Sequence, residues 1–171
     1  MTEPDATRFE VVWNSSYDAL FGFVGRRCHP DRVADIVEET FLAAWRRLED
    51  CPADPRPWLF GIARGILAND RRSLRRAEAL RARLQSILVD TAVPANEPDA
   101  GRASEAFAQL RPRDREAVAL VAWDDLTAAE AARVVGCSEA TFRVRLHRAR
   151  KQLQTALAPS PTPSMTGEEP T

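Results

Sequence analysis

The sequence predicts an all-α fold made of two small helical domains that are joined by a flexible linker. Three observations lead to this fold class. Apolar residues recur at the three- and four-residue spacing of a helix face through most of the chain. No window alternates between apolar and polar residues with the period of two that a half-buried strand shows. An acidic, proline-containing stretch over residues 85–103 lacks helical periodicity and therefore reads as a flexible acidic linker.

Composition narrows the class of protein further. The 171 residues suffice for one ordinary domain or two small ones, and 44% of them are hydrophobic, which is enough for a core. No stretch approaches the about 20 apolar residues of a membrane span, and the acidic N-terminus lacks the apolar segment of a secretory signal. The few, scattered histidines and cysteines predict no metal site and no disulfide framework. We therefore expect a cytoplasmic protein with inert thiols at Cys28, Cys51 and Cys137.

The first domain is predicted over residues 6–84 from three helices. The first helix has an apolar face that runs over residues 9–24 and includes Phe21, and the second has one over residues 33–48 that begins after the turn residues His29, Pro30 and Asp31. Three prolines within residues 51–57 predict a loop. The third helix presents an apolar face over residues 59–74 that ends at Leu74.

The second domain is predicted over residues 104–158, followed by a proline-rich tail (159–171) that is disordered by composition. Its helical patterns lie near residues 104–110, 113–123, 128–135 and 138–157. Thr127 and Glu130 have the spacing of a capping box, Gly136 suits the left-handed residue that ends a helix, and Ser138 suits the next N-cap. So short a turn forces the two helices to cross steeply, which predicts a helix-turn-helix.

The net charge of −1 at pH 7 conceals two strongly basic segments. Of the 24 basic residues only Lys151 is a lysine, and the others are arginines. Residues 64–83 hold seven arginines and two acidic residues, whereas residues 141–158 hold five basic residues and no acidic one. Two basic segments in a neutral chain indicate two contacts with a polyanion, although two solvated helix faces would give the same pattern.

The last helix has an apolar face and a basic face. Its core positions follow the spacing i, i+4, i+7, i+11 and are Phe142, Leu146, Ala149 and Leu153. The residues that then point outward together are Arg143, Val144, His147, Arg148 and Lys151. Arginines near the start of such a helix can bind guanine or clamp phosphate, so this face is predicted to bind DNA. The alternative is a basic surface helix.

Charged and aromatic residues in the first domain suggest two further surfaces. The second helix has an acidic stripe opposite its apolar face, which fits a basic protein partner or a solvated surface. The third helix carries an arginine face, and four aromatic residues lie in the two helices that flank the proline-rich loop. Aromatic and arginine side chains together can hold an unstacked single strand, but core packing is the favoured role of Trp45 and Trp58.

Four segments resemble the extracytoplasmic-function (ECF) sigma factors, the small group of the sigma-70 family. They are DIVEETFLAAW (35–45), PRPWLFGIAR (55–64), LRPRDREAV (110–118) and GCSEATFRVRLHRAR (136–150). The resemblance covers residues 8–157 in the family's order and spacing. It implies a bacterial transcription initiation factor, not an enzyme and without a cofactor, that binds the clamp and flap of core RNA polymerase. It also implies binding of a double-stranded −35 and a single-stranded −10 promoter element, with an anti-sigma factor as a candidate partner.

Carried over position by position, the resemblance also implies the site residues. The polymerase clamp would be contacted by Asp35, Glu38, Glu39 and Leu42. The −35 element would be contacted by Ser138, Thr141, Arg143, Val144, Arg145, His147, Arg148 and Lys151. The flipped −10 base would be held by Leu48, Glu49, Asp50, Cys51 and Pro52, and the −10 strand would follow Arg64, Asn69, Arg71 and Arg72. The linker would thread the polymerase channel.

The sequence departs from the family pattern at four positions. Glu38 stands where glutamine is usual, and Gly65 and Asn69 stand where Asn and Asp are usual. Val144 replaces a small polar residue of the recognition helix. Valine can contact a thymine methyl but offers no hydrogen bond, which predicts an unusual −35 preference.

A stand-alone helix-turn-helix regulator that binds DNA as a dimer is the alternative function. The near-neutral charge favours a subunit, because a stand-alone DNA binder usually carries a basic excess. An enzyme is the weakest class, since the sequence holds no Gly-rich phosphate loop, no Ser/His/Asp set and no paired carboxylates in an apolar context.

Overall fold

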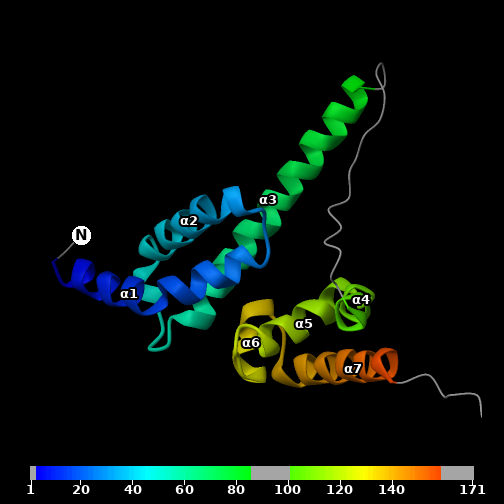
Figure 1. The fold of residues 1–171 in the computed structure, drawn as a ribbon. Coiled ribbons are helices and arrows are strands. Elements are labelled where there is room, and N and C mark those ends of the chain that lie inside the picture. Colours follow the sequence, from blue (N-terminus) through cyan, green and yellow to red (C-terminus); the bar gives the residue numbers. More distant parts are fainter. Residues whose placement is uncertain (1–2, 86–100, 159–171) are drawn as a thin grey trace, which may run out of the picture.

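A computed structural model describes residues 3–85 and 101–158 (Figure 1). All regular structure in these two ranges is helical, which confirms the all-α prediction. The elements are α1 (Glu3–Gly25), η1 (Pro30–Arg32), α2 (Val33–Trp45), η2 (Leu48–Asp50), α3 (Arg56–Gln85), α4 (Arg102–Ala108), α5 (Pro112–Ala122), α6 (Ala128–Val135) and α7 (Glu139–Leu157). Most of the predicted linker and the predicted tail lie outside the described residues.

The core of the N-terminal part forms where α1, α2 and α3 pack against one another. Large side chains from all three helices are almost fully buried there, among them Leu20, Phe23, Ile36, Phe41 and Phe60. The rings of Phe23 and Phe60 stack with their centroids 4.3 Å apart, which joins α1 to α3 directly. Burial of each such side chain contributes roughly 1.5–3 kcal/mol relative to an exposed position.

Two predicted core positions are wrong, and a third is only half-buried. Phe21 is 43% exposed and Phe23 is buried instead, because Phe23 lies three residues after Leu20 and shares its face of α1. Leu74 is 52% exposed, since α3 projects well beyond α1 and α2 (Figure 1). Leu153 is only half-buried, because it lies toward the exposed end of α7.

Two boundaries in the N-terminal part also differ from prediction. A 3₁₀ turn over Pro30–Arg32 precedes α2, and the His29 side chain accepts a hydrogen bond from the backbone N–H of Asp31 at 3.4 Å. The proline-rich loop ends earlier than predicted, because α3 begins at Arg56 and Pro57 lies in its first turn. Proline is tolerated there since the first helical N–H groups have no intrahelical acceptor.

The helix-turn-helix of α6 and α7 is built by local capping interactions, as predicted. The backbone N–H of Thr127 donates to Glu130 Oε2 at 2.7 Å, and the Glu130 N–H donates to Thr127 Oγ1 at 3.3 Å. The hydroxyl of Thr127 also donates to Glu130 Oε2 at 2.6 Å, and the two hydrogen bonds that Thr127 donates to this carboxylate lower the pKa of Glu130. Gly136 ends α6 in the left-handed conformation (φ 73°), and Ser138 caps α7 by accepting from the Thr141 N–H at 3.2 Å. The crossing of the two helices therefore follows from residues 127–141.

Gly136→Ala is expected to lower the free energy of unfolding by about 1–2 kcal/mol, because a side chain disfavours the left-handed conformation. A Cβ at this position would meet no atom within 4 Å, so the cost comes from the backbone alone. Chemical denaturation followed by circular dichroism measures the change. Gly65→Ala is the control: it lies inside α3 with open space around it, and should stabilise by up to about 1 kcal/mol. A neutral Gly136→Ala would contradict the assigned cap.

The two helical units also pack against each other, which the sequence did not predict. Helix α6 lies against α3, and buried apolar side chains of both units belong to one cluster. Figure 1 shows α5 and α6 beside the N-terminal half of α3. This contact determines which of the predicted site residues are accessible.

Candidate nucleic-acid interface

The outward face of α7 is exposed and basic. Phe142, Leu146 and Ala149 are buried and fix the rotation of the helix. As a result Thr141, Arg143, Val144, His147, Arg148 and Lys151 are exposed, and Arg145 is half-buried. Arg143 Nη2 lies 2.5 Å from Glu139 Oε1 one turn earlier, so this predicted base contact is occupied by an ion pair. Val144 presents an apolar surface that is 52% exposed.

A groove of about 890 Å³ runs between this face and the start of α5. Its lining includes four arginines and one acidic residue: Arg111, Arg113, Arg145, Arg148 and Asp114. Arg111 and Arg113 were not predicted as site residues. The signal that could have found them is Pro112 at the first position of α5, since a helix N-terminus attracts phosphate and basic residues on both sides of it strengthen that attraction.

The acidic stripe of α2 lies on its solvent face. Asp35, Glu38 and Glu39 are exposed, and Leu42 beside them is 50% exposed, whereas six other residues of α2 are buried. Arg32 Nη1 lies 2.6 Å from Asp35 Oδ2 and Nη2 lies 3.1 Å from Asp70 Oδ1 on α3. The hydrogen bond to Asp70 raises the pKa of Arg32. The stripe is thus an accessible acidic surface with an apolar centre.

The predicted base-holding loop splits into anchoring and accessible residues. Leu48 and Cys51 are buried, and Arg8 Nη2 donates to the Cys51 carbonyl at 2.8 Å, so these two residues fix the loop to the core. Burial raises the pKa of the Cys51 thiol. Glu49, Asp50 and Pro52 are exposed. Figure 1 shows this segment at the start of α3.

A cleft of about 400 Å³ opens beside this loop. Asp50 and Pro52 line it, together with Trp58 and Gly61 of α3 and Arg133 of α6. A Cβ on Gly61 would meet no atom within 4 Å, so the space of the cleft next to Gly61 is unobstructed. Trp58 is half-buried. Its side chain packs against the hydrophobic core and also forms part of the wall of the cleft.

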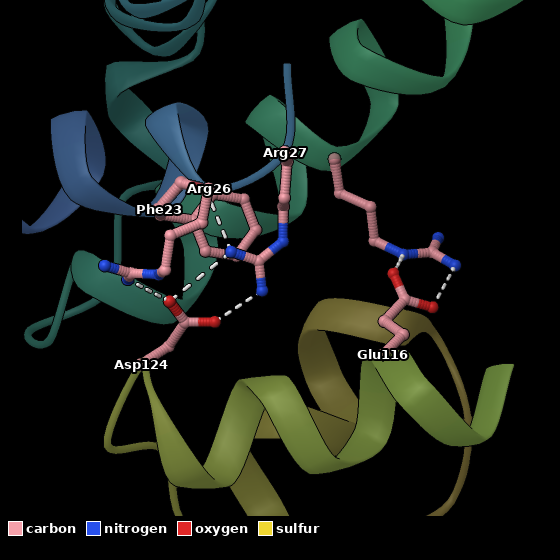
Figure 2. A network of polar contacts seen from close by, with 6 residues as sticks. Phe23, Arg26, Arg27, Glu116 and Asp124 are labelled. Carbon is pink, nitrogen blue, oxygen red and sulfur yellow. Dashed lines mark hydrogen bonds and ion pairs between the residues drawn. The ribbon is translucent and has the colours of Figure 1, made fainter. Parts of the chain in front are cut away.

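The predicted arginine face of α3 is only partly accessible. Asn69, Arg71 and Arg72 are exposed, and Arg71 Nη2 donates to the Arg27 carbonyl at 3.3 Å. Arg64 instead forms two hydrogen bonds to Glu116 of α5 and is half-buried (Figure 2). The carboxylate of Glu116 raises the pKa of Arg64.

Within the described residues, no group of three or more potential ligands could hold a metal ion, and none of the helices is long and apolar enough to cross a membrane.

Comparison with known proteins agrees with this arrangement. Residues 12–77 match the family model for Sigma-70 region 2, and residues 101–153 match Sigma-70, region 4. The ECF RNA polymerase sigma factor SigL of Mycobacterium tuberculosis is 31% identical over 133 residues, which cover 74% of this chain and 75% of SigL. The ECF RNA polymerase sigma factor SigC of the same species is 34% identical over 148 residues, covering 84% of this chain and 80% of SigC.

Solved structures show the same fold. CnrH in complex with the cytosolic domain of CnrY superposes with a TM-score of 0.58 at 27% identity, covering 87% of this chain and 86% of CnrH. The sigma factor RpoE of Bartonella quintana, solved with the anti-sigma factor NepR, has a TM-score of 0.59 over 87% of this chain and 96% of RpoE. Both family regions, in this order and over most of the chain, show that it belongs to the ECF group of sigma-70 factors, the subunits that direct bacterial RNA polymerase to promoters.

Proposed function

We propose that residues 104–158 read the −35 element as duplex DNA through the outward face of α7. The observation that carries this assignment is the exposed basic face beside a groove lined by four arginines. Arg148, which lines the groove, and the exposed His147 would meet base edges, whereas Arg111, Arg113 and Arg145 of the groove would contact phosphates. Val144 would pack on a thymine methyl, and Ser138, Thr141 and Lys151 would contact the backbone.

Residues 6–84 would capture the −10 element as a single strand. The cleft beside the loop over residues 48–52 offers an open space lined by Trp58, next to exposed Asp50 and Pro52. An aromatic side chain such as that of Trp58 is an element on which proteins stack an unpaired base. Arg64, Asn69, Arg71 and Arg72 would then follow the backbone of the strand along α3.

The acidic stripe of α2 would dock on the clamp of core RNA polymerase. Asp35, Glu38 and Glu39 supply the charge, and the half-exposed Leu42 supplies an apolar centre for the interface. The C-terminal domain would contact the flap, and the segment between the domains would follow the polymerase channel. The chain would act in the cytoplasm, where polymerase and promoter are found, without catalysing a reaction itself.

An anti-sigma factor would control this activity. CnrH, which shares the fold at 27% identity, was solved with the cytosolic domain of CnrY, and RpoE was solved with the anti-sigma factor NepR. By similarity, a comparable partner would bind the present chain and compete with polymerase.

Transcription by purified core RNA polymerase tests this function. The chain is mixed with core enzyme, promoters are selected from a genomic library, and run-off transcripts are quantified. We expect transcripts that depend on the added chain. The proposal is wrong if the chain elutes as a dimer, retards duplex DNA alone and never co-elutes with core enzyme.

Arg148→Ala should reduce transcription from such a promoter without unfolding the domain. Loss of one bidentate base contact weakens binding by about 1–3 kcal/mol. Arg150→Ala is the matched control, because Arg150 is equally exposed on α7 but lines a different surface near Leu157. Equal transcription by both variants would remove Arg148 from the residues that read the promoter.

A further inference from the structure

The two domains are held together by charged groups as well as by apolar packing, and one of these groups is a proposed DNA contact. The charged contacts join α5 and the loop after it to α3 and the turn after α1 (Figure 2). They connect residues that are 52 to 98 positions apart in the sequence.

Asp124 forms the first of these contacts. Its side chain has no solvent exposure, and both of its oxygens accept hydrogen bonds from arginines of the N-terminal domain. Arg26 donates to Oδ1, and Arg27 Nη2 donates to Oδ2 at 2.5 Å. Arg27 is itself held in place, since Nη1 donates to the Phe23 carbonyl at 2.9 Å and the guanidinium carbon lies 3.7 Å from the centre of the Phe23 ring. Asp124 is therefore a fully buried carboxylate that is paired with two arginines.

Glu116 forms the second contact. Its Oε1 accepts from Arg64 Nε at 2.7 Å and its Oε2 accepts from Arg64 Nη2 at 3.1 Å. This is the two-pronged geometry in which a guanidinium binds a carboxylate or a phosphate. Glu116 thus occupies the hydrogen-bonding edge of Arg64 that a DNA phosphate would use.

The surroundings of both carboxylates are strongly basic. A cavity of about 400 Å³ between the domains is lined by Arg26, Arg27, Arg64, Arg71, Arg113 and Arg115, and Glu116 is the acidic residue of that lining. Packing the domains together brings these six guanidinium groups close to one another, which is unfavourable by Coulomb repulsion. Glu116 and Asp124 offset this repulsion, and because Asp124 is fully buried, leaving this charge pair without one partner is strongly destabilising.

Packing of the domains also affects the proposed base-holding cleft. Arg133 of α6 forms part of the wall of that cleft, opposite Asp50, Pro52 and Trp58 of the N-terminal domain. In contrast, the outward face of α7 remains exposed. The packed arrangement therefore pairs Arg64, one of the proposed −10 contacts, with Glu116, and leaves the −35 contacts free.

We propose that Asp124 and Glu116 form an interdomain latch that keeps the free chain closed and masks Arg64 from the −10 strand. This inference rests on the proposed role of Arg64 in binding the strand. A carboxylate and a phosphate cannot both occupy the Nε–Nη2 edge of Arg64, so latch closure and binding of the strand through that edge exclude each other. The domains must separate before the −10 element is bound, whereas the −35 face is available in both states.

Small-angle X-ray scattering of the free full chain tests the latch without DNA or polymerase. The variant combines Asp124→Asn with Glu116→Gln, and its radius of gyration is expected to exceed that of the wild type by roughly a fifth, since two separated domains are less compact than one body. The control combines Asp125→Asn with Glu105→Gln, which changes the net charge equally at two exposed positions. Asn tolerates the positive φ of Asp125 (51°), so the control should scatter like the wild type.

Arg64→Glu combined with Glu116→Arg provides an independent variant. It exchanges the two charges and should restore a compact chain, whereas Arg64→Glu alone should expand it. Helix content from circular dichroism shows that all variants are folded. An extended wild type, or an Asp124/Glu116 variant as compact as the control, overturns the latch.

Binding of a fluorescein-labelled dT12 oligonucleotide tests the masking of Arg64. We expect the Asp124→Asn/Glu116→Gln variant to bind dT12 several-fold more tightly than the control variant, because Arg64 becomes available. Equal affinities would overturn the masking even if the chain opens. Failure of the proposed sigma function would appear separately, as a lack of transcription with core enzyme.

Discussion

Phe142→Ala is expected to lower the free energy of unfolding of the C-terminal domain by about 3–5 kcal/mol. The ring has no solvent exposure and belongs to the cluster that includes Leu120, Leu126 and Leu146, so its removal leaves a cavity under the recognition helix. Urea denaturation followed by circular dichroism measures the loss. Because this side chain positions α7, the amount of transcript should fall together with the free energy of unfolding.

Val144→Ala is the control for this prediction. It shortens an apolar side chain of the same helix, but Val144 is 52% exposed, so the change in stability should be within about 0.5 kcal/mol. If Phe142→Ala unfolds at the same urea concentration as Val144→Ala, the assignment of the buried face of α7 is wrong.

Reversal of Asp35, Glu38 and Glu39 to lysine is expected to abolish binding to core RNA polymerase. The three side chains are exposed, and the only ion pair among them in the described structure joins Asp35 to Arg32, a surface contact worth about 0–1 kcal/mol. The fold should therefore survive while the charge of the docking surface is inverted. Size-exclusion chromatography with core enzyme measures co-elution, and circular dichroism confirms the helix content.

A second triple variant controls for the change in net charge. Glu10, Asp18 and Glu78 are exposed on other helix surfaces, and their reversal to lysine adds the same charge away from the stripe. This variant should still co-elute with core enzyme. Retention of the α2 variant on the polymerase would show that the stripe is not the docking surface.

Short-range signals made the helix-turn-helix the most predictable part of the chain. The capping box, the left-handed Gly136 and the Ser138 cap each involve residues at most four positions apart, so a short stretch of sequence contains all their partners. The inner face of α2 was also predicted correctly, because the helix is covered on one side throughout its length. Periodicity failed at Phe21 and Leu74, where a regular apolar spacing continued although the neighbouring helices did not cover it.

The proposed site was predictable in its types of residue but not in its accessibility. Arg64 and Arg72 both belong to the basic segment of α3, yet Arg64 is paired with Glu116 and Arg72 is exposed. Within the predicted loop, Leu48 and Cys51 anchor the chain while Asp50 and Pro52 line a cleft. Burial depends on which elements meet in space, and an isolated sequence does not contain that information.

The sequence by itself determined the all-α class, the order of the two helical units, the caps of the helix-turn-helix and the basic and acidic helix faces. These features depend on residue type and on spacing within a few turns of one helix. Only the tertiary structure placed Asp124 between Arg26 and Arg27, and Glu116 on Arg64, across separations of 52 to 98 residues. A long-range ion pair has no periodicity and no local partner, so its two halves look like ordinary surface charges until the chain is folded.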